Sequence, residues 1–146
     1  MALVQRRTEY VVKPASDSES DRVAACRAVL GAVAGDLTRF ETDIPWSMAD
    51  EWPAEVRAAA EILSAADRRR RGTDDYRQTG IQEAGDPGLW EAFVAFAPYA
   101  FDASAWSAEG RPIVSLADCA TSIAVRLRDD QVEQVAAAIS PARLTR

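Results

Sequence analysis

The fold is decided by the stretch Tyr99-Ala100-Phe101-Asp102-Ala103-Ser104-Ala105-Trp106, in which two kinds of side chain alternate. In an extended chain, successive side chains point to opposite sides, so Phe101, Ala103 and Ala105 share one face. The residues that follow each of them, namely Asp102, Ser104 and Trp106, share the other face. This period of two is typical of a strand with one buried and one polar face.

Two further segments of strand length follow, at 112–117 and 121–127. In the second of them Ile123, Val125 and Leu127 alternate with more polar residues. Short connections at 107–110 and 118–120 are of hairpin length. The sequence therefore predicts a three-stranded antiparallel meander in the last third of the chain.

The segments before the meander predict helices. A stripe of apolar residues at steps of three and four indicates a helix over about 18–39, and it consists of Val23, Cys26, Leu30, Val33 and Leu37. A second helix is expected from Pro53 to Ala66, and a third between Asp86 and Pro98. The segment 41–53, with two prolines and two tryptophans, is interpreted as a packed loop.

The two ends of the chain complete the prediction. Asp129 or Asp130 begins a C-terminal helix that ends before Pro141, and residues 9–13 form a short strand that can join the sheet. Helices that precede strands favour the α+β class over a parallel α/β sheet. We expect one domain over 1–146, with a loose arm at 1–8 and a mobile loop at 72–87.

Composition excludes several classes of function. The chain has 17 Lys plus Arg against 23 Asp plus Glu, a formal charge of −6, and no His. Net negative charge opposes binding to nucleic acid, and the absence of His removes the commonest metal ligand. The seven glycines form no phosphate-binding motif, so we expect no nucleotide cofactor, and no metal.

The compartment is inferred from further absences. No stretch reaches the roughly 20 apolar residues that cross a membrane, and the N-terminus lacks the apolar core of a secretory signal. The two cysteines, Cys26 and Cys119, are far apart and are interpreted as thiols. We therefore expect a cytoplasmic protein that does not bind membranes.

Acidic and aromatic residues mark two candidate binding segments. The first carries Asp43, Trp46, Asp50, Glu51 and Trp52, a combination that could hold a cation or a basic protein surface. The competing interpretation places both indole rings in the core and the acids in water. The second segment is Asp74-Asp75-Tyr76, which is either a contact loop for a partner or a solvated connection.

Two other features have a functional and a structural interpretation. If the polar face of the first meander strand lined a pocket, Asp102 could act as a catalytic acid or base, and Asp43 is a second candidate. The structural interpretation makes Asp102 part of a solvated outer face. The tetrad Arg68–Arg71 is either an anion site or the basic end of the second helix.

Three hypotheses for function follow. The first is a non-enzymatic binding protein whose acidic, aromatic-bearing surface neutralises a basic protein partner, as an immunity protein or antitoxin would. The second is a pocket protein for a small apolar or cationic ligand, or an accessory enzyme of a biosynthetic pathway that works through Asp102 or Asp43. The third is a structural module that associates with copies of itself through exposed strand edges.

Overall fold

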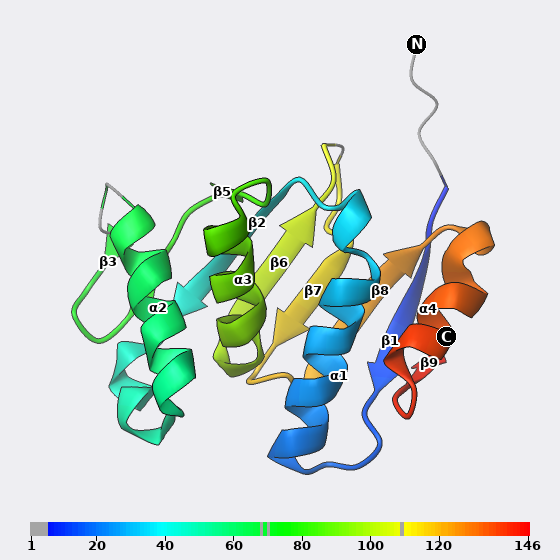
Figure 1. The fold of residues 1–146 in the computed structure, drawn as a ribbon, viewed down its shortest axis with the longest axis horizontal. Helices are drawn as coiled ribbons and strands as arrows, with labels where there is room; N and C mark the ends of the chain where they lie inside the picture. Colours follow the sequence, from blue (N-terminus) through cyan, green and yellow to red (C-terminus); the bar gives the residue numbers. More distant parts are fainter. Residues whose placement is uncertain (1–5, 68, 70, 109) are drawn as a thin grey trace.

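The chain forms one antiparallel sheet with helices packed on one of its faces (Figure 1). The computed structural model describes residues 6–67, 69, 71–108 and 110–146. The strands in this part of the chain are β1 (Thr8–Lys13), β2 (Arg39–Ile44), β3 (Arg71–Gly72), β4 (Arg77–Gln78), β5 (Gln82–Glu83), β6 (Asp102–Trp106), β7 (Val114–Ala117), β8 (Ser122–Leu127) and β9 (Arg143–Thr145). Their order is β3-β4-β2-β6-β7-β8-β1-β9, and β5 also pairs with β2.

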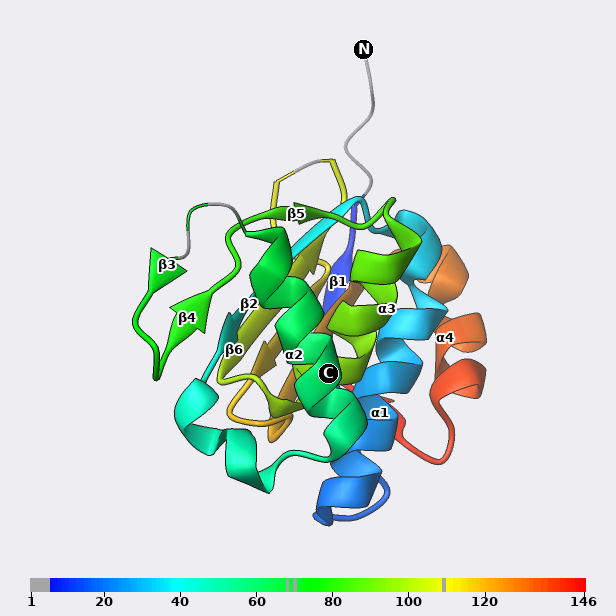
Figure 2. The same cartoon turned by 60° about the vertical axis from the view of Figure 1, so that its left-hand side comes forward.

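The α-helices lie side by side over one face of the sheet in the order α2, α3, α1, α4 (Figure 2). Their bounds are α1 (Glu19–Ala32), α2 (Ala54–Ala66), α3 (Pro87–Phe96) and α4 (Val132–Ile139). Four 3₁₀ turns accompany them, η1 (Ala34–Asp36), η2 (Trp46–Glu51), η3 (Ala97–Tyr99) and η4 (Asp129–Gln131). None of the described helices is long and apolar enough to cross a membrane.

Local sequence explains where two of these helices begin. The hydroxyl of Ser18 accepts a hydrogen bond from the amide of Asp21 at the start of α1. At the start of α3, the carboxylate of Asp86 accepts hydrogen bonds from the amides of Gly88 and Leu89. Both caps satisfy amides that have no partner inside the helix.

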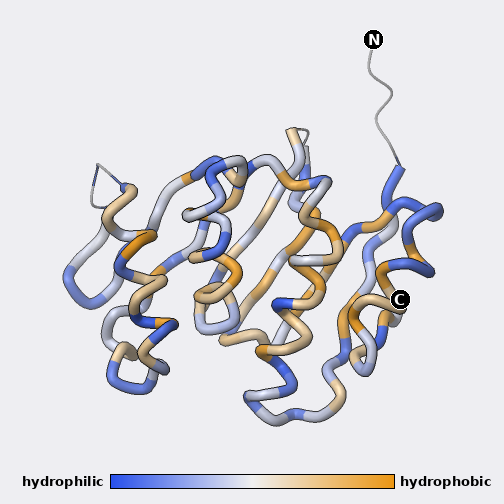
Figure 3. Tube along the Cα trace, viewed as in Figure 1, coloured by the Kyte–Doolittle hydropathy of each residue, from blue (hydrophilic) through white to orange (hydrophobic). Residues whose placement is uncertain are grey.

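The core lies between the helices and the sheet face that they cover. The ring of Phe40 in β2 stacks on Phe93 of α3, with 4.3 Å between centroids, and both side chains are fully buried. Apolar segments of the helices and of the central strands make up this layer (Figure 3). Antiparallel sheets commonly leave one face to solvent, and no described helix covers the opposite face here. We call this second face the open face.

The register defines the open face. A row across the sheet pairs Glu41 with Ser104, Ser104 with Ser115, and Ser115 with Ala124. Residues directly opposite each other in a ladder point to the same side. This row of the open face therefore carries small and polar side chains, while larger ones lie on the same face in the neighbouring positions, where Arg39 pairs with Trp106 and Glu9 with Arg126.

The predicted three-stranded meander is wrong. Strands β6, β7 and β8 are consecutive antiparallel neighbours, but they form the middle of a nine-stranded sheet within the described residues. The structure is still α+β, with β1 paired to β8 at one side of the meander and β2 paired to β6 at the other.

Strand β2 was not predicted, because its residues were assigned to the end of the helix over 18–39 and to the loop over 41–53. The helix ends at Ala32, where Val33 takes a non-helical conformation between Gly31 and Gly35. Polar side chains are buried on both faces of the strand, Thr42 on one and Asp43 on the other, and they interrupt the apolar alternation that would have revealed it. The remaining strands β3, β4, β5 and β9 have two or three residues each, which is too few to show a period.

Two other segments differ in detail from expectation. The interval 72–87, interpreted as a loop, contributes short strands to the sheet through β3, β4 and β5. Of the arm at 1–8, residues 1–5 lie outside the described part of the chain, whereas Thr8 begins β1. Of the tetrad Arg68–Arg71, Arg68 and Arg70 lie outside it as well, and Arg71 belongs to β3.

A carboxylate in η1 ties three distant parts of the chain together. Oδ2 of Asp36 accepts hydrogen bonds from Arg7 at 3.3 Å, Arg128 at 3.2 Å and Gln131 at 3.1 Å. Burial alone would raise the pKa of Asp36, but the hydrogen bond from Gln131 and the charges of Arg128 and Arg7 outweigh it. The net effect is a pKa below the usual range for Asp.

We expect Asp36→Asn to lower the free energy of unfolding by about 1–3 kcal/mol at pH 7, because Arg7 loses its charged partner and Arg128 keeps only the exposed Asp130. A lowered folded pKa gives stability that is present above the unfolded pKa of about 3.9 and is lost as the pH falls through the folded pKa. The loss in the variant should therefore shrink below about pH 3.5. Urea denaturation at both pH values measures it.

Asp130→Asn is the matched control, since Asp130 also pairs with Arg128 but its side chain is 76% exposed. Its effect should stay within about 0.5 kcal/mol. Equal losses in the two variants, or a loss in Asp36→Asn that does not depend on pH, would contradict the assignment.

Candidate functional site

A groove on the open face is lined in part by a buried carboxylate of β2, that of Asp43. Asp43 is only 3% exposed, and its Oδ1 accepts a hydrogen bond from the amide of Phe101 at 2.9 Å. Its Oδ2 accepts one from the hydroxyl of Tyr76 at 2.7 Å. The groove has a volume of about 240 Å³, and the residues that line it include Glu41, Asp43, Tyr76, Gln78, Asp102 and Ser104. We call it the acidic groove.

The β3–β4 hairpin supplies one wall of the acidic groove. Its turn requires Gly72, which has φ of +103° and whose Cβ, if present, would lie 2.2 Å from the carbonyl oxygen of Tyr76. The hairpin is joined to β2 through a hydrogen bond from the amide of Thr79 to the carbonyl of Thr42. These constraints place the Tyr76 hydroxyl over Asp43.

The carboxylates of Glu41, Asp43 and Asp102 line the acidic groove together with one cation, Arg71, which is paired with Asp67. Glu41 and Asp102 are exposed, and neither of them nor Asp43 forms an ion pair with a described Lys or Arg. Burial raises the pKa of Asp43 above its ordinary value, although hydrogen bonds from Tyr76 and two backbone amides oppose the shift. A cation that entered the groove would meet the two solvated carboxylates first.

An aromatic pair stands beside these carboxylates. The rings of Tyr76 and Phe101 are stacked at 6.5 Å between centroids, and each residue is more than a third exposed. Exposed aromatic rings next to carboxylates can bind a guanidinium or ammonium group through both π and charge interactions. The rim of the groove thus has the chemistry of a cation site.

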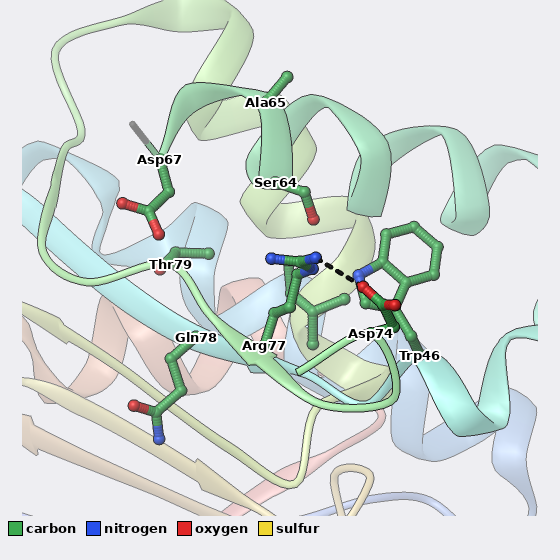
Figure 4. Close-up of a pocket in the computed structure, with 9 residues that line it drawn as sticks. Trp46, Ser64, Ala65, Asp67, Asp74, Arg77, Gln78 and Thr79 are labelled. Carbon is green, nitrogen blue, oxygen red and sulfur yellow. Dashed lines mark hydrogen bonds and ion pairs between the residues drawn. The ribbon is translucent and has the colours of Figure 1, made fainter. Parts of the chain in front are cut away.

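A second pocket lies on the other side of β4, between the hairpin and α2 (Figure 4). Its volume is about 470 Å³, and its lining includes Ile44, Trp46, Ser64, Asp67, Asp74 and Arg77. The guanidinium of Arg77 lies in the middle of the view, and its Nη2 donates to Asp74 at 3.0 Å. We call this the Trp46 pocket.

The structure does not bring the predicted site residues together in one place. Asp43, Tyr76 and Asp102 meet in the acidic groove, whereas Trp46 and Asp74 line the Trp46 pocket. Asp50 and Glu51 are exposed in η2, and Asp50 lies 3.9 Å from Arg57. Asp75 is exposed, and its carbonyl accepts from the amide of Ser47.

Trp52 lies in the core, as the competing interpretation of the tryptophan segment predicted. It is 9% exposed and meets the ring of Phe96 edge to face at 5.0 Å. It also contacts Trp46, whose ring is 5.6 Å away. Trp52 thus belongs to the core and gives Trp46 its support.

Sequence reasoning missed Glu41 in the acidic groove, Phe101 beside it, and Ser64 and Arg77 in the Trp46 pocket. Glu41 alternates with Phe40 and Thr42, so the assignment of β2 as a strand would have placed it beside Asp43 on the outer face. Ser64 and Arg77 carry no such signal, because only the packing of the hairpin against α2 brings them together.

Other reactive chemistry has little support in the described part of the chain. Burial raises the pKa of Cys26 to about 12, and burial also raises the pKa of Cys119, so both thiols stay protonated at neutral pH. Both are free cysteines. The described residues include no cluster of three His, Cys, Asp or Glu arranged to hold a metal ion.

The chain matches no protein family model, no curated protein and no solved structure in the comparisons made with each of them.

We expect Tyr76→Phe to lower the free energy of unfolding by about 1–2 kcal/mol at pH 7, since Oδ2 of Asp43 loses its donor while it stays buried. A hydrogen bond to the charged carboxylate opposes protonation, so its loss raises the pKa of Asp43 further. The cost of the substitution should therefore be smaller at pH 3.5, where Asp43 is protonated. Chemical denaturation at the two pH values measures this.

Tyr10→Phe serves as the control, because the Tyr10 ring contacts Arg146 and its hydroxyl donates no hydrogen bond to a described residue. This variant should change stability by less than about 0.5 kcal/mol at either pH. A Tyr76→Phe effect of the same size as this control would show that the hydrogen bond to Asp43 does not contribute to stability.

Proposed function

We propose that the chain is a non-enzymatic binding protein whose acidic groove receives a cationic side chain of a basic protein partner. A protein of the immunity or antitoxin kind, which neutralises its partner by covering it, would act in this way. The observation that carries the proposal is the meeting of Glu41, Asp43 and Asp102 beside the exposed rings of Tyr76 and Phe101.

The size of the acidic groove supports a side chain as its occupant. At about 240 Å³ it is smaller than the roughly 300 Å³ at which pockets for small molecules begin. An arginine or lysine side chain that projects from a partner would need only such a recess. The guanidinium or ammonium group could then pair with Asp102 and Glu41, while its stem packs on the aromatic rings.

The open face supports a protein partner of larger footprint. Stable protein interfaces bury about 800 Å² on each side, which is more than a single groove provides. The row of small side chains through Ser104, Ser115 and Ala124 continues from the groove across the sheet. The formal charge of −6 would attract a basic partner at long range and speed association.

One specific observation supports the alternative of a small-molecule pocket protein. Trp46 lines a pocket of about 470 Å³, within the size range of small-molecule sites. The carboxylates proposed for catalysis lie outside that pocket. Asp43 uses one oxygen for Tyr76 and the other for Phe101, so its role in the fold is to join the hairpin to β6.

The test is capture of partners from an extract of the native host, followed by binding measurements with each purified candidate. We expect a basic protein whose affinity falls as salt rises, because charge pairs on the surface are screened. The double variant Glu41→Gln/Asp102→Asn should bind at least about tenfold more weakly, as expected for the loss of two exposed charge contacts.

The control is Glu61→Gln/Glu91→Gln, which removes the same net charge from exposed positions on α2 and α3. Its affinity should stay within about twofold of wild type. Partner binding that is indifferent to salt, or that both double variants weaken equally, would refute the assignment to the acidic groove.

A further inference from the structure

The Trp46 pocket contains a guanidinium group with spare donors. Arg77 presents its side chain from β4 and is 23% exposed, and its partner within the described residues is Asp74. The Asp74 side chain is fully exposed, so this ion pair is of the weak surface kind. A guanidinium has five N–H donors, of which Asp74 occupies one. A ligand could therefore bind Arg77 without breaking a buried contact.

A second donor points into the same pocket. The hydroxyl oxygen of Ser64, in the last turn of α2, is buried and has no hydrogen-bond partner in the described part of the chain. In Figure 4 it points from the helix toward the guanidinium of Arg77. A buried hydroxyl without a partner has a cost in stability. An acceptor that lay between Ser64 and Arg77 would recover this cost.

The one buried acid of the pocket is already neutralised. Asp67 accepts hydrogen bonds from Nη1 of Arg71 at 2.8 Å and from the amides of Arg69 and Arg71 at 3.2 Å each. Nη1 of Arg71 is held in place by the carbonyl of Thr79 at 3.1 Å. The charge of Asp67 is therefore compensated by groups other than Arg77. The charged partner of Arg77 within the described residues is therefore Asp74 alone, and an anion would compete only with that exposed carboxylate.

The remaining walls are apolar. Ile44 of β2, the indole of Trp46 and Ala65 of α2 line the pocket beside the two donors. Small-molecule sites combine such walls with a few polar groups that fix orientation. We propose that the Trp46 pocket binds a small organic acid, with its carboxylate on Arg77 and Ser64 and its apolar body against Trp46. The site is separate from the acidic groove, and neither proposal depends on the other.

The test uses phenylacetate as the probe and phenylacetamide as its neutral analogue. Proton–nitrogen NMR spectra follow the indole N–H of Trp46 and the amide of Ser64 during titration of the full chain. We expect saturable shifts with phenylacetate and a Kd of about 1 mM, as is usual for a fragment of this size. Phenylacetamide should bind at least about tenfold more weakly, because it cannot form a charge-assisted pair with Arg77.

Two variants test the two donors. Arg77→Gln should weaken phenylacetate binding at least about tenfold, whereas Arg57→Gln, on an exposed arginine of α2, should leave it unchanged. Ser64→Ala should weaken binding about fivefold and yet raise Tm, since it removes an unpaired buried hydroxyl. This opposite response of affinity and stability distinguishes a ligand-binding role from a structural one, and it remains measurable if Arg77→Gln fails to fold.

Three results would overturn the proposal: equal affinity for phenylacetate and phenylacetamide, shifts that do not saturate, or unchanged affinity in Ser64→Ala. The variant Glu41→Gln/Asp102→Asn should bind phenylacetate as wild type does, since both residues lie in the acidic groove. Failure of the Trp46 pocket is thus distinguishable from failure of the acidic groove.

Discussion

The buried carboxylate of Asp43 joins the parts of the chain that form both candidate sites. It lies in β2, between the meander strand β6 and the short hairpin β3–β4, and it holds both of them through Phe101 and Tyr76. A buried acid is costly unless its oxygens are satisfied, so the chain must place a donor on each side. The acidic groove forms between these two donors, and the Trp46 pocket lies across β4 from it.

The sheet divides the molecule into a face that is packed against the helices and a face that no described helix covers (Figure 2). The helices cover one face, where Phe40, Phe93 and their neighbours form a filled core. The open face carries the row through Ser104 and Ser115, the pair Arg39–Trp106, and the carboxylates of Glu41 and Asp102. Substitutions at exposed positions of the open face, such as Glu41 and Asp102, leave the core intact, so affinity for the proposed partner can change there with little effect on folding.

Sequence predicted the parts of the fold in which one period runs long enough to be read. The alternation through Ala103 and Ala105 indicated β6, and the stripe through Cys26 and Leu30 indicated α1. It could not reveal β2, because a strand with Thr42 and Asp43 buried between apolar residues loses its alternation. Of the site, it identified Asp43, Tyr76 and Asp102 as candidates by residue type. It did not bring them together, because hairpin pairing sets their proximity.

The margins of the sheet limit how the molecule can meet copies of itself. Its outermost strands are β3 and β9, of two and three residues, and both contain an arginine. Short, charged border strands are a common protection against lateral growth of sheets and against fibril formation. The border strands therefore offer few backbone groups with which a strand of a second copy could pair. Any lasting assembly of this chain would have to form through side chains on its broad surface, where shape and charge select the companion.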